Sequence, residues 1–204
     1  MRKAGILVLI SLLGLPFLLF AQDSGNPDVE TDWDDFSSEL YVTGDQSFII
    51  SLGVGIPTIF INNGQIINHQ ITPPVGGAGS LVYNYHLSPS LFIGFDLGLK
   101  FLPTIGGNTL FLIPVGGRVG TQFSIWRFEF PIAFTFGLSW HNYLNFGYFN
   151  IFAKAGAAAF FRVNSEWSFG LTANWCLFPE WTSDPAKNVY GNILELLISA
   201  RYHF

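Results

Sequence analysis

Isolated charged residues lie along segments of the chain that are otherwise apolar or small. Three acids and five bases have this placement: Asp96, Lys100, Arg118, Arg127, Glu129, Lys154, Glu195 and Arg201. His86 and His203 are placed in the same way. An ionised group in a dry interior is stable only when an opposite charge pairs with it. The pattern therefore predicts a mutually paired charge network that fills a protein interior. The alternative, because bases outnumber acids, is the lining of a gated or anion-attracting pore.

Ser139 and His141 are the residues whose spacing comes nearest to that of a catalytic pair. Two residues apart on an extended chain, they point to the same side, as a nucleophile and its base must. Neither His141 nor His69 has an acidic residue nearby in the sequence, and no Ser/His/acid spacing recurs. We therefore interpret His141 as an interfacial residue beside Trp140 and expect no catalytic activity.

Metal, cofactor and nucleic-acid chemistry find no support in the sequence. His, Cys and acidic residues are not spaced as metal ligands, and the chain has no glycine-rich phosphate loop. A net charge of −5 does not favour binding to nucleic acid. We expect no metal, no cofactor and no nucleic-acid partner.

The elements that carry these residues alternate in polarity with a period of two, which is typical of β-strands. The clearest is 126–140, whose even positions are Trp126, Phe128, Phe130, Ile132, Phe134, Phe136, Leu138 and Trp140. Its odd positions hold charged, small or polar residues. Such a strand, when tilted, spans roughly 35 Å, about one hydrocarbon core with its interfaces. Pro131 cannot donate to a ladder, so a bulge or local break is expected there.

Eight segments show this alternation, at 46–56, 80–87, 91–101, 110–120, 126–140, 148–161, 167–178 and 190–204. An even number of strands places both termini on one side, and the connections alternate between short turns and longer loops. Four tryptophans are expected at the membrane interfaces: Trp126, Trp140, Trp167 and Trp175. The sequence predicts an all-β fold, an eight-stranded antiparallel up-and-down transmembrane β-barrel over 46–204. An Asn63-Gly64 pair predicts a hairpin in the loop after the first strand.

Composition favours a membrane barrel over a soluble one. The chain has 204 residues, of which 50% are hydrophobic, 17% aromatic and 11% charged, whereas soluble domains carry about 25% charged residues. No internal run of about 20 apolar residues could form a transmembrane helix. A soluble lipocalin-like barrel with its apolar face inward is the alternative. The bulk of the Phe and Trp side chains and the poor solvent face of Gly, Ala, Ser and Thr argue against it.

The N-terminal segment changes from apolar to polar after residue 21. Arg2 and Lys3 precede an apolar run that ends at Phe20 and Ala21, which predicts a secretory signal peptide over 1–21; a retained anchor is the alternative. Residues 22–45 contain eight acids and no base, which predicts a disordered periplasmic leader. Its spacing does not match a calcium loop. The sole cysteine, Cys176, excludes an intramolecular disulfide.

The last strand ends on Tyr202 and Phe204, an apolar alternation that stops at a terminal aromatic residue. This end resembles the closing strand of bacterial outer-membrane β-barrels, in which it is the signal read by the assembly machinery. The mature chain is similar to the small eight-stranded families, the OmpA transmembrane domain and OmpW-like proteins. The resemblance implies integral location in the bacterial outer membrane. The implied partners are outer-membrane lipid, the barrel-assembly machinery and periplasmic chaperones.

Two functions without catalysis follow from this resemblance. The first is an OmpW-like, porin-like narrow conduit for small molecules, hydrophobic ones included, with a lateral opening near Pro131 and the alanine-rich strand 148–161. The second is a plugged structural or surface-binding barrel, adhesin-like, that acts through extracellular loops at 57–79 and 178–188. The sequence does not identify a ligand for these loops.

Overall fold

The alternating segments form strands in the computed structural model of the chain. The structure describes residues 41–62, 65–67, 75–104, 108–144, 146–180 and 188–204. The chain divides into two units, Met1–Asp35 and Phe36–Phe204, and all described residues belong to the second. The predicted signal peptide and most of the predicted leader lie outside the described residues. No helix within the described ranges is long and apolar enough to cross a membrane.

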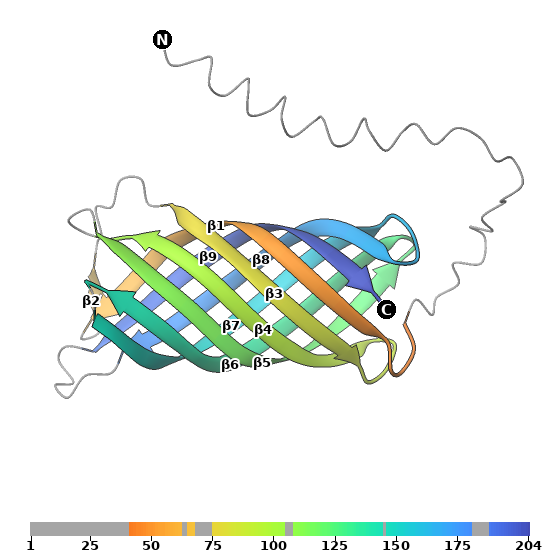
Figure 1. The fold of residues 1–204 in the computed structure, drawn as a ribbon, viewed down its shortest axis with the longest axis horizontal. Coiled ribbons are helices and arrows are strands. Elements are labelled where there is room, and N and C mark those ends of the chain that lie inside the picture. Colours follow the sequence, from red (N-terminus) through yellow and green to blue (C-terminus); the bar gives the residue numbers. More distant parts are fainter. Residues whose placement is uncertain (1–40, 63–64, 68–74, 105–107, 145, 181–187) are drawn as a thin grey trace, which may run out of the picture. The chain divides into compact units, whose positions relative to one another are not determined.

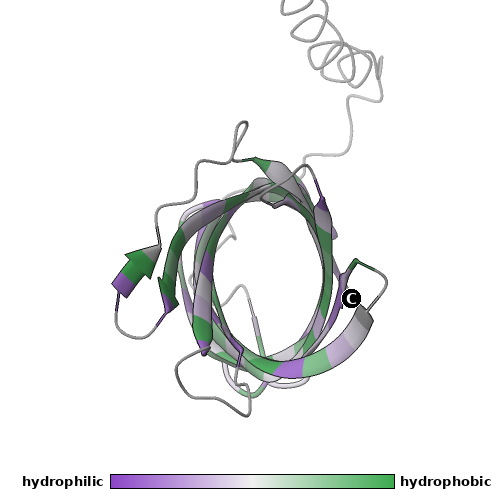
Figure 2. Cartoon of the chain, turned by 90° about the vertical axis from the view of Figure 1, so that its left-hand side faces the viewer, coloured by the Kyte–Doolittle hydropathy of each residue, from purple (hydrophilic) through white to green (hydrophobic). Residues whose placement is uncertain are grey.

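Within the described residues, nine strands form one antiparallel sheet that closes on itself. Their bounds are β1 Gln46–Asn62, β2 Gln65–Ile67, β3 Gly76–His86, β4 Leu91–Pro103, β5 Thr109–Ile125, β6 Phe128–Tyr143, β7 Phe146–Arg162, β8 Trp167–Glu180 and β9 Val189–His203 (Figure 1). Each long strand pairs with the next along the chain, and β1 pairs with β9 to complete the ring seen along the axis in Figure 2. The eight long strands confirm the predicted up-and-down barrel.

The short strand β2 is an addition to the predicted eight. It pairs with the end of β1, with Asn62 opposite Gln65. This pairing is that of the predicted hairpin, although Asn63 and Gly64 themselves lie outside the described residues. Several long strands extend beyond their predicted ends, because the alternation continues in a weaker form; β1 reaches Asn62 where 56 was expected.

Among the described strands, the ladder is irregular at three prolines. On β5, Ile113 and Pro114 have no paired residue on β4. Glu129 pairs with Phe160 and Ile132 with Ala157, but Phe130 and Pro131 have no paired residue on β7. This is the local break expected at Pro131, since proline lacks the N–H that a ladder needs. The third irregularity shifts the β1–β9 register between Pro57 and Phe60.

The bulky aromatic side chains point outward. On β6, Phe128, Phe134 and Phe136 are 42%, 49% and 54% exposed, whereas Glu129 between them is fully buried. Green and purple bands alternate along the strands in Figure 2, as this arrangement requires. A soluble barrel would show the reverse, with the rings inside and the carboxylate in water. The exposed apolar wall is therefore a lipid-facing surface.

The short turns and the C-terminus lie at one end of the barrel, which is the periplasmic end of bacterial barrels (Figure 1). Apolar side chains also point into the lumen, in two layers that the sequence analysis did not predict. The upper apolar layer, in the loop half, contains Leu102, Leu112, Phe152, Cys176, Phe178 and Ile193. The lower apolar layer, nearer the periplasmic end, contains Ile49, Val82 and Phe160.

Candidate functional site

Between the two apolar layers lies the middle ionic layer, formed by Asp96, Lys100, Arg118, Lys154 and Glu195. Lys100 Nζ lies 2.7 Å from Glu195 Oε1, and Lys154 Nζ lies 2.5 Å from Asp96 Oδ2. Arg118 Nη1 approaches the same Asp96 oxygen at 3.6 Å. The Asn174 amide donates to Glu195 Oε2 at 2.8 Å. Inward positions of β4, β5, β7, β8 and β9 supply these groups, so the pairs hold strands together across the lumen.

A second cluster, the periplasmic ionic layer, is centred on Glu129. Arg201 Nη1 donates to Glu129 Oε2 at 2.7 Å, and Arg162 Nη1 lies 3.4 Å from Oε1. The Arg201 guanidinium also lies over the Phe160 ring, 4.1 Å from its centre. His203 Nε2 and the Ser168 hydroxyl form a hydrogen bond of 2.8 Å beside this cluster. One buried carboxylate thus pairs with two guanidinium groups, and its loss would remove the counter-charge that they share.

Tyr41 completes the periplasmic ionic layer from outside the strands. Its hydroxyl donates to Glu129 Oε2 at 2.8 Å and accepts from Arg201 Nη1 at 3.0 Å. The hydroxyl is also 3.1 Å from His203 Nδ1, and the ring stacks on His86 at 4.2 Å between centroids. Burial raises the pKa of the Tyr41 phenol to about 12, so it stays a neutral donor. Tyr41 therefore fills the periplasmic mouth of the lumen.

A short strap, residues 41–45, holds Tyr41 in this position. Gly44 N donates to His86 O, and His86 N donates to Asp45 O, both at 2.9 Å. The Asp45 carboxylate accepts from Val42 N at 2.9 Å, and Gly44 has the positive φ of 104° that this tight turn requires. These hydrogen bonds attach the last residues of the predicted leader, 41–45, to β3.

Arg127 does not belong to either ionic layer, so its predicted place in the lumen was wrong. β6 begins at Phe128, and Trp126 with Arg127 forms the turn that precedes it. The Arg127 guanidinium lies against the rings of Trp126 and Phe161. The prediction failed because the alternation of 126–140 continues through the turn without a break. Arg162, the last residue of β7, takes the inward position instead.

The space left inside the barrel is small. A cavity of about 10 Å³ lies beside Asp96, Arg118 and Lys154 and reaches the lower apolar layer at Phe160. A volume of this size holds about one water molecule. An eight-stranded barrel has an interior that side chains can fill, and the inward side chains of the four layers occupy this one.

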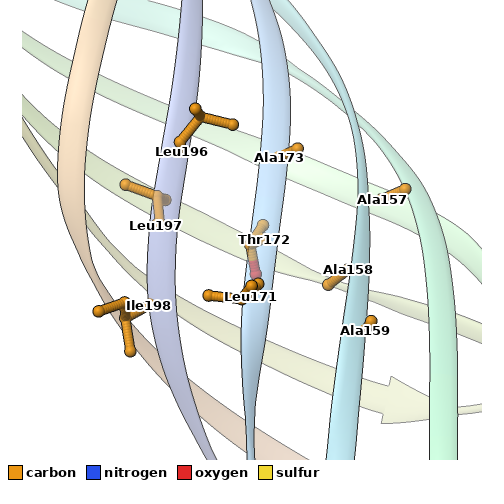
Figure 3. Close-up of a pocket in the computed structure, with 9 residues that line it drawn as sticks. All are labelled: Ala157, Ala158, Ala159, Leu171, Thr172, Ala173, Leu196, Leu197 and Ile198. Carbon is orange, nitrogen blue, oxygen red and sulfur yellow. The ribbon is translucent and has the colours of Figure 1, made fainter.

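The alanine-rich strand β7 forms a groove on the outer face of the wall. The groove, of about 600 Å³, runs across β7, β8 and β9 and is lined by Ala157, Ala158, Ala159, Leu171, Thr172, Ala173, Leu196, Leu197 and Ile198 (Figure 3). The β7–β8 ladder is continuous along it, from Ala153 opposite Leu177 to Arg162 opposite Ser168. The wall is therefore hydrogen-bonded across the groove, and its depth comes from the absence of large side chains.

Ser139 and His141 point inward but do not form a nucleophile–base pair. The Ser139 hydroxyl is buried and has no hydrogen-bond partner among the described residues. His141 Nδ1 instead lies 3.5 Å from Glu180 Oε1, which accepts a hydrogen bond of 2.8 Å from the Tyr148 hydroxyl. Glu180 is 39 positions away in sequence, so local spacing could not reveal it. His69 lies outside the described residues.

The C-terminus closes the barrel. Phe204 and Gln46 exchange backbone hydrogen bonds of 3.1 Å, and Phe204 itself is exposed. Tyr202 packs outward against Trp167, with ring centroids 5.0 Å apart. Of the other tryptophans expected at the interfaces, Trp126 and Trp175 are exposed on the outer surface and Trp140 is half-buried near the loop end of β6.

A family model without a functional description matches residues 25–202. The chain belongs to this family. An uncharacterised protein of Borreliella burgdorferi is 24% identical over 172 residues, which are 74% of this chain and 80% of that protein. An uncharacterised protein of Treponema pallidum is 24% identical over 125 residues, 57% of this chain. The chain spans only 43% of the length of that relative.

Neisserial surface protein A is a solved structure similar to this member of the family. The two share 11% identity at a TM-score of 0.58, over 79% of this chain and 97% of the other. At this identity the likeness shows the fold, a small eight-stranded outer-membrane barrel. Together with the apolar outer wall and the enclosed charges, it makes the protein an integral β-barrel of the bacterial outer membrane.

Proposed function

We propose that the protein is a closed outer-membrane barrel without catalytic activity, which acts at the cell surface through its extracellular loops. The observation that supports this is the set of buried ion pairs across the lumen, beside which lies a cavity with room for about one water molecule. Solute passage would require separating Lys154 from Asp96 or Lys100 from Glu195. Breaking a buried ion pair leaves uncompensated charges in a dry interior, which is strongly unfavourable.

The extracellular end offers a structure on which such a surface role can rest. The β1–β2 hairpin extends beyond the start of β3, and Ile66 on it is 67% exposed. Ile66 is not required to cover the barrel interior, which the upper apolar layer already fills. In this proposal, Ile66 is a residue of the hairpin that a partner would contact. The barrel would then serve as the rigid anchor for these segments.

A narrow conduit is the second candidate, and one observation favours it. The outer groove and the inner cavity share Ala158 and Thr172, so one layer of small side chains separates lipid from lumen at this point. A hydrophobic solute could use this thin part of the wall only if the β7–β8 ladder opened. The continuous pairing of these strands makes that the weaker candidate.

Solute flux into liposomes distinguishes the two candidates. Purified full chain is folded into phospholipid vesicles, and entry of arabinose and of the hydrophobic dye N-phenylnaphthylamine is followed. We expect both rates to equal those of protein-free vesicles within error, because the layered lumen has no continuous path. Uptake that rises with the amount of folded protein would contradict the closed barrel. Uptake of the dye alone would favour the lateral conduit.

A further inference from the structure

The middle ionic layer contains more cations than carboxylates. Among the described residues, its cations are Lys100, Arg118 and Lys154, and its carboxylates are those of Asp96 and Glu195. Lys100 has Glu195 as its own partner, whereas Lys154 and Arg118 share a single oxygen of Asp96. The shared oxygen lies 2.5 Å from Lys154 Nζ and 3.6 Å from Arg118 Nη1. One carboxylate therefore faces two cations, and Arg118 has the weaker pairing.

The cavity of about 10 Å³ lies beside this excess of positive charge. Arg118 Nε is buried and has no hydrogen-bond partner among the described residues, and a buried donor without an acceptor is unfavourable. The Lys154 ammonium carries three N–H donors, of which the ion pair with Asp96 needs only one. Three hydroxyl groups, which can rotate to donate, also line the cavity: those of Ser51, Ser80 and Thr172. Asp96 is the one acid among the described residues that line it, so cationic donors outnumber anionic acceptors there.

We propose that this cavity binds one halide ion, such as chloride, beside Arg118 and Lys154. The ion accepts from Arg118 Nε and Lys154 Nζ and supplies the negative charge that the second cation lacks. This compensation matters because the lower apolar layer also lines the cavity, and a charge in an apolar interior is costly unless it is paired.

The size and the charge of the cavity together select the ligand. A space for about one water molecule admits a monatomic ion and excludes phosphate, sulfate and carboxylates. A water molecule could bridge Arg118 Nε and Asp96 Oδ1, which is also buried without a hydrogen-bond partner among the described residues, but it would leave the excess charge in place. The inference does not depend on the role proposed for the extracellular loops.

Retention of radioactive chloride by the full chain tests this site. The chain is folded into dodecyl maltoside micelles in sodium gluconate with labelled chloride, and is then passed through a desalting column without label. The wild type is expected to retain about one chloride per folded barrel, because the ion can leave only if buried ion pairs open. An excess of sulfate during folding should not reduce this amount, since sulfate is too large for the cavity.

Arg118→Gln removes the excess charge and leaves Lys154 paired with Asp96, so this variant should retain no more chloride than protein-free micelles. Arg127→Gln is the matched control, because it removes the same charge from a turn outside both ionic layers, and it should retain as much chloride as the wild type. A wild type without retained chloride would overturn the proposal in favour of a water molecule, even if Arg118→Gln did not fold. Full retention by folded Arg118→Gln, or displacement of chloride by sulfate, would also overturn it.

Discussion

Glu129→Leu is expected to lower the free energy of unfolding of the barrel by about 3–5 kcal/mol, the usual effect of removing one partner of a buried ion pair. The carboxylate is fully buried and accepts from Arg201 and Tyr41 while pairing with Arg162. Leucine would remove from the lumen the carboxylate with which Arg201 and Arg162 pair. The measurement is urea unfolding in phospholipid vesicles, followed by tryptophan fluorescence.

Two milder substitutions test the cause of this loss. Tyr41→Phe keeps the ring on His86 but removes one hydrogen bond to Glu129, and should lower the free energy of unfolding by about 1 kcal/mol. Glu166→Gln removes an exposed acid from a turn and should change it by less than about 0.5 kcal/mol. If Glu129→Leu were no more destabilising than Glu166→Gln, the periplasmic ionic layer would not stabilise the fold as described.

Phe134→Arg is expected to destabilise the barrel by about 2–4 kcal/mol, the cost of an arginine on the lipid face near the middle of the bilayer. Phe134 lies near the centre of β6 and is 49% exposed on the outer wall. A guanidinium at this position would meet acyl chains and could reach water only by distorting the bilayer. The free energy of unfolding in the same vesicles provides the measurement.

Val163→Arg is the matched control for this prediction. Val163 is also an exposed apolar residue, but it lies in the periplasmic turn between β7 and β8, beyond the strands. The same change there should alter the free energy of unfolding by about 0.5 kcal/mol or less. Equal effects of the two substitutions would mean that Phe134 faces water, and would contradict a membrane-spanning wall.

The order and facing of the strands could be predicted from the sequence because a barrel wall separates two environments. Every second residue meets lipid, so the period of two persists along each strand. The Phe134 and Phe136 side chains and the enclosed Glu129 follow that period without exception. The break at Pro131 was equally predictable, because it depends only on a missing N–H.

The partners of the enclosed charges could not be predicted in this way. Lys100 on β4 meets Glu195 on β9, and Glu129 on β6 meets Arg201 on β9. These pairs cross the lumen between strands that are not neighbours, so they depend on strand tilt and stagger rather than on spacing. The alternation of polarity along each strand identified residues that face inward. It gave no information about their height along the barrel axis.

Tyr41 and Arg127 mark the two points at which local patterns were misleading. Tyr41 lies in an acidic segment without alternation, and only its contacts with Glu129 and His86 reveal that it closes the periplasmic mouth. Arg127 occupies an odd position, like the lumen-facing residues of β6, although it lies in the tight turn before that strand. Both residues lie outside the strands, where the two-residue period does not apply.

Proton polarisation transfer in a lipid bilayer tests the central claim most directly, that aromatic side chains face lipid while the charged groups are enclosed in a filled lumen. In solid-state NMR spectra of the full chain, magnetisation from acyl-chain protons should reach the rings of Phe134 and Phe136 rapidly. Transfer from acyl chains or from bulk water should reach the side chains of Lys154 and Glu195 only slowly. Rapid transfer from water to Lys154 would contradict the filled lumen, and slow transfer from acyl chains to Phe134 would contradict the membrane-facing wall.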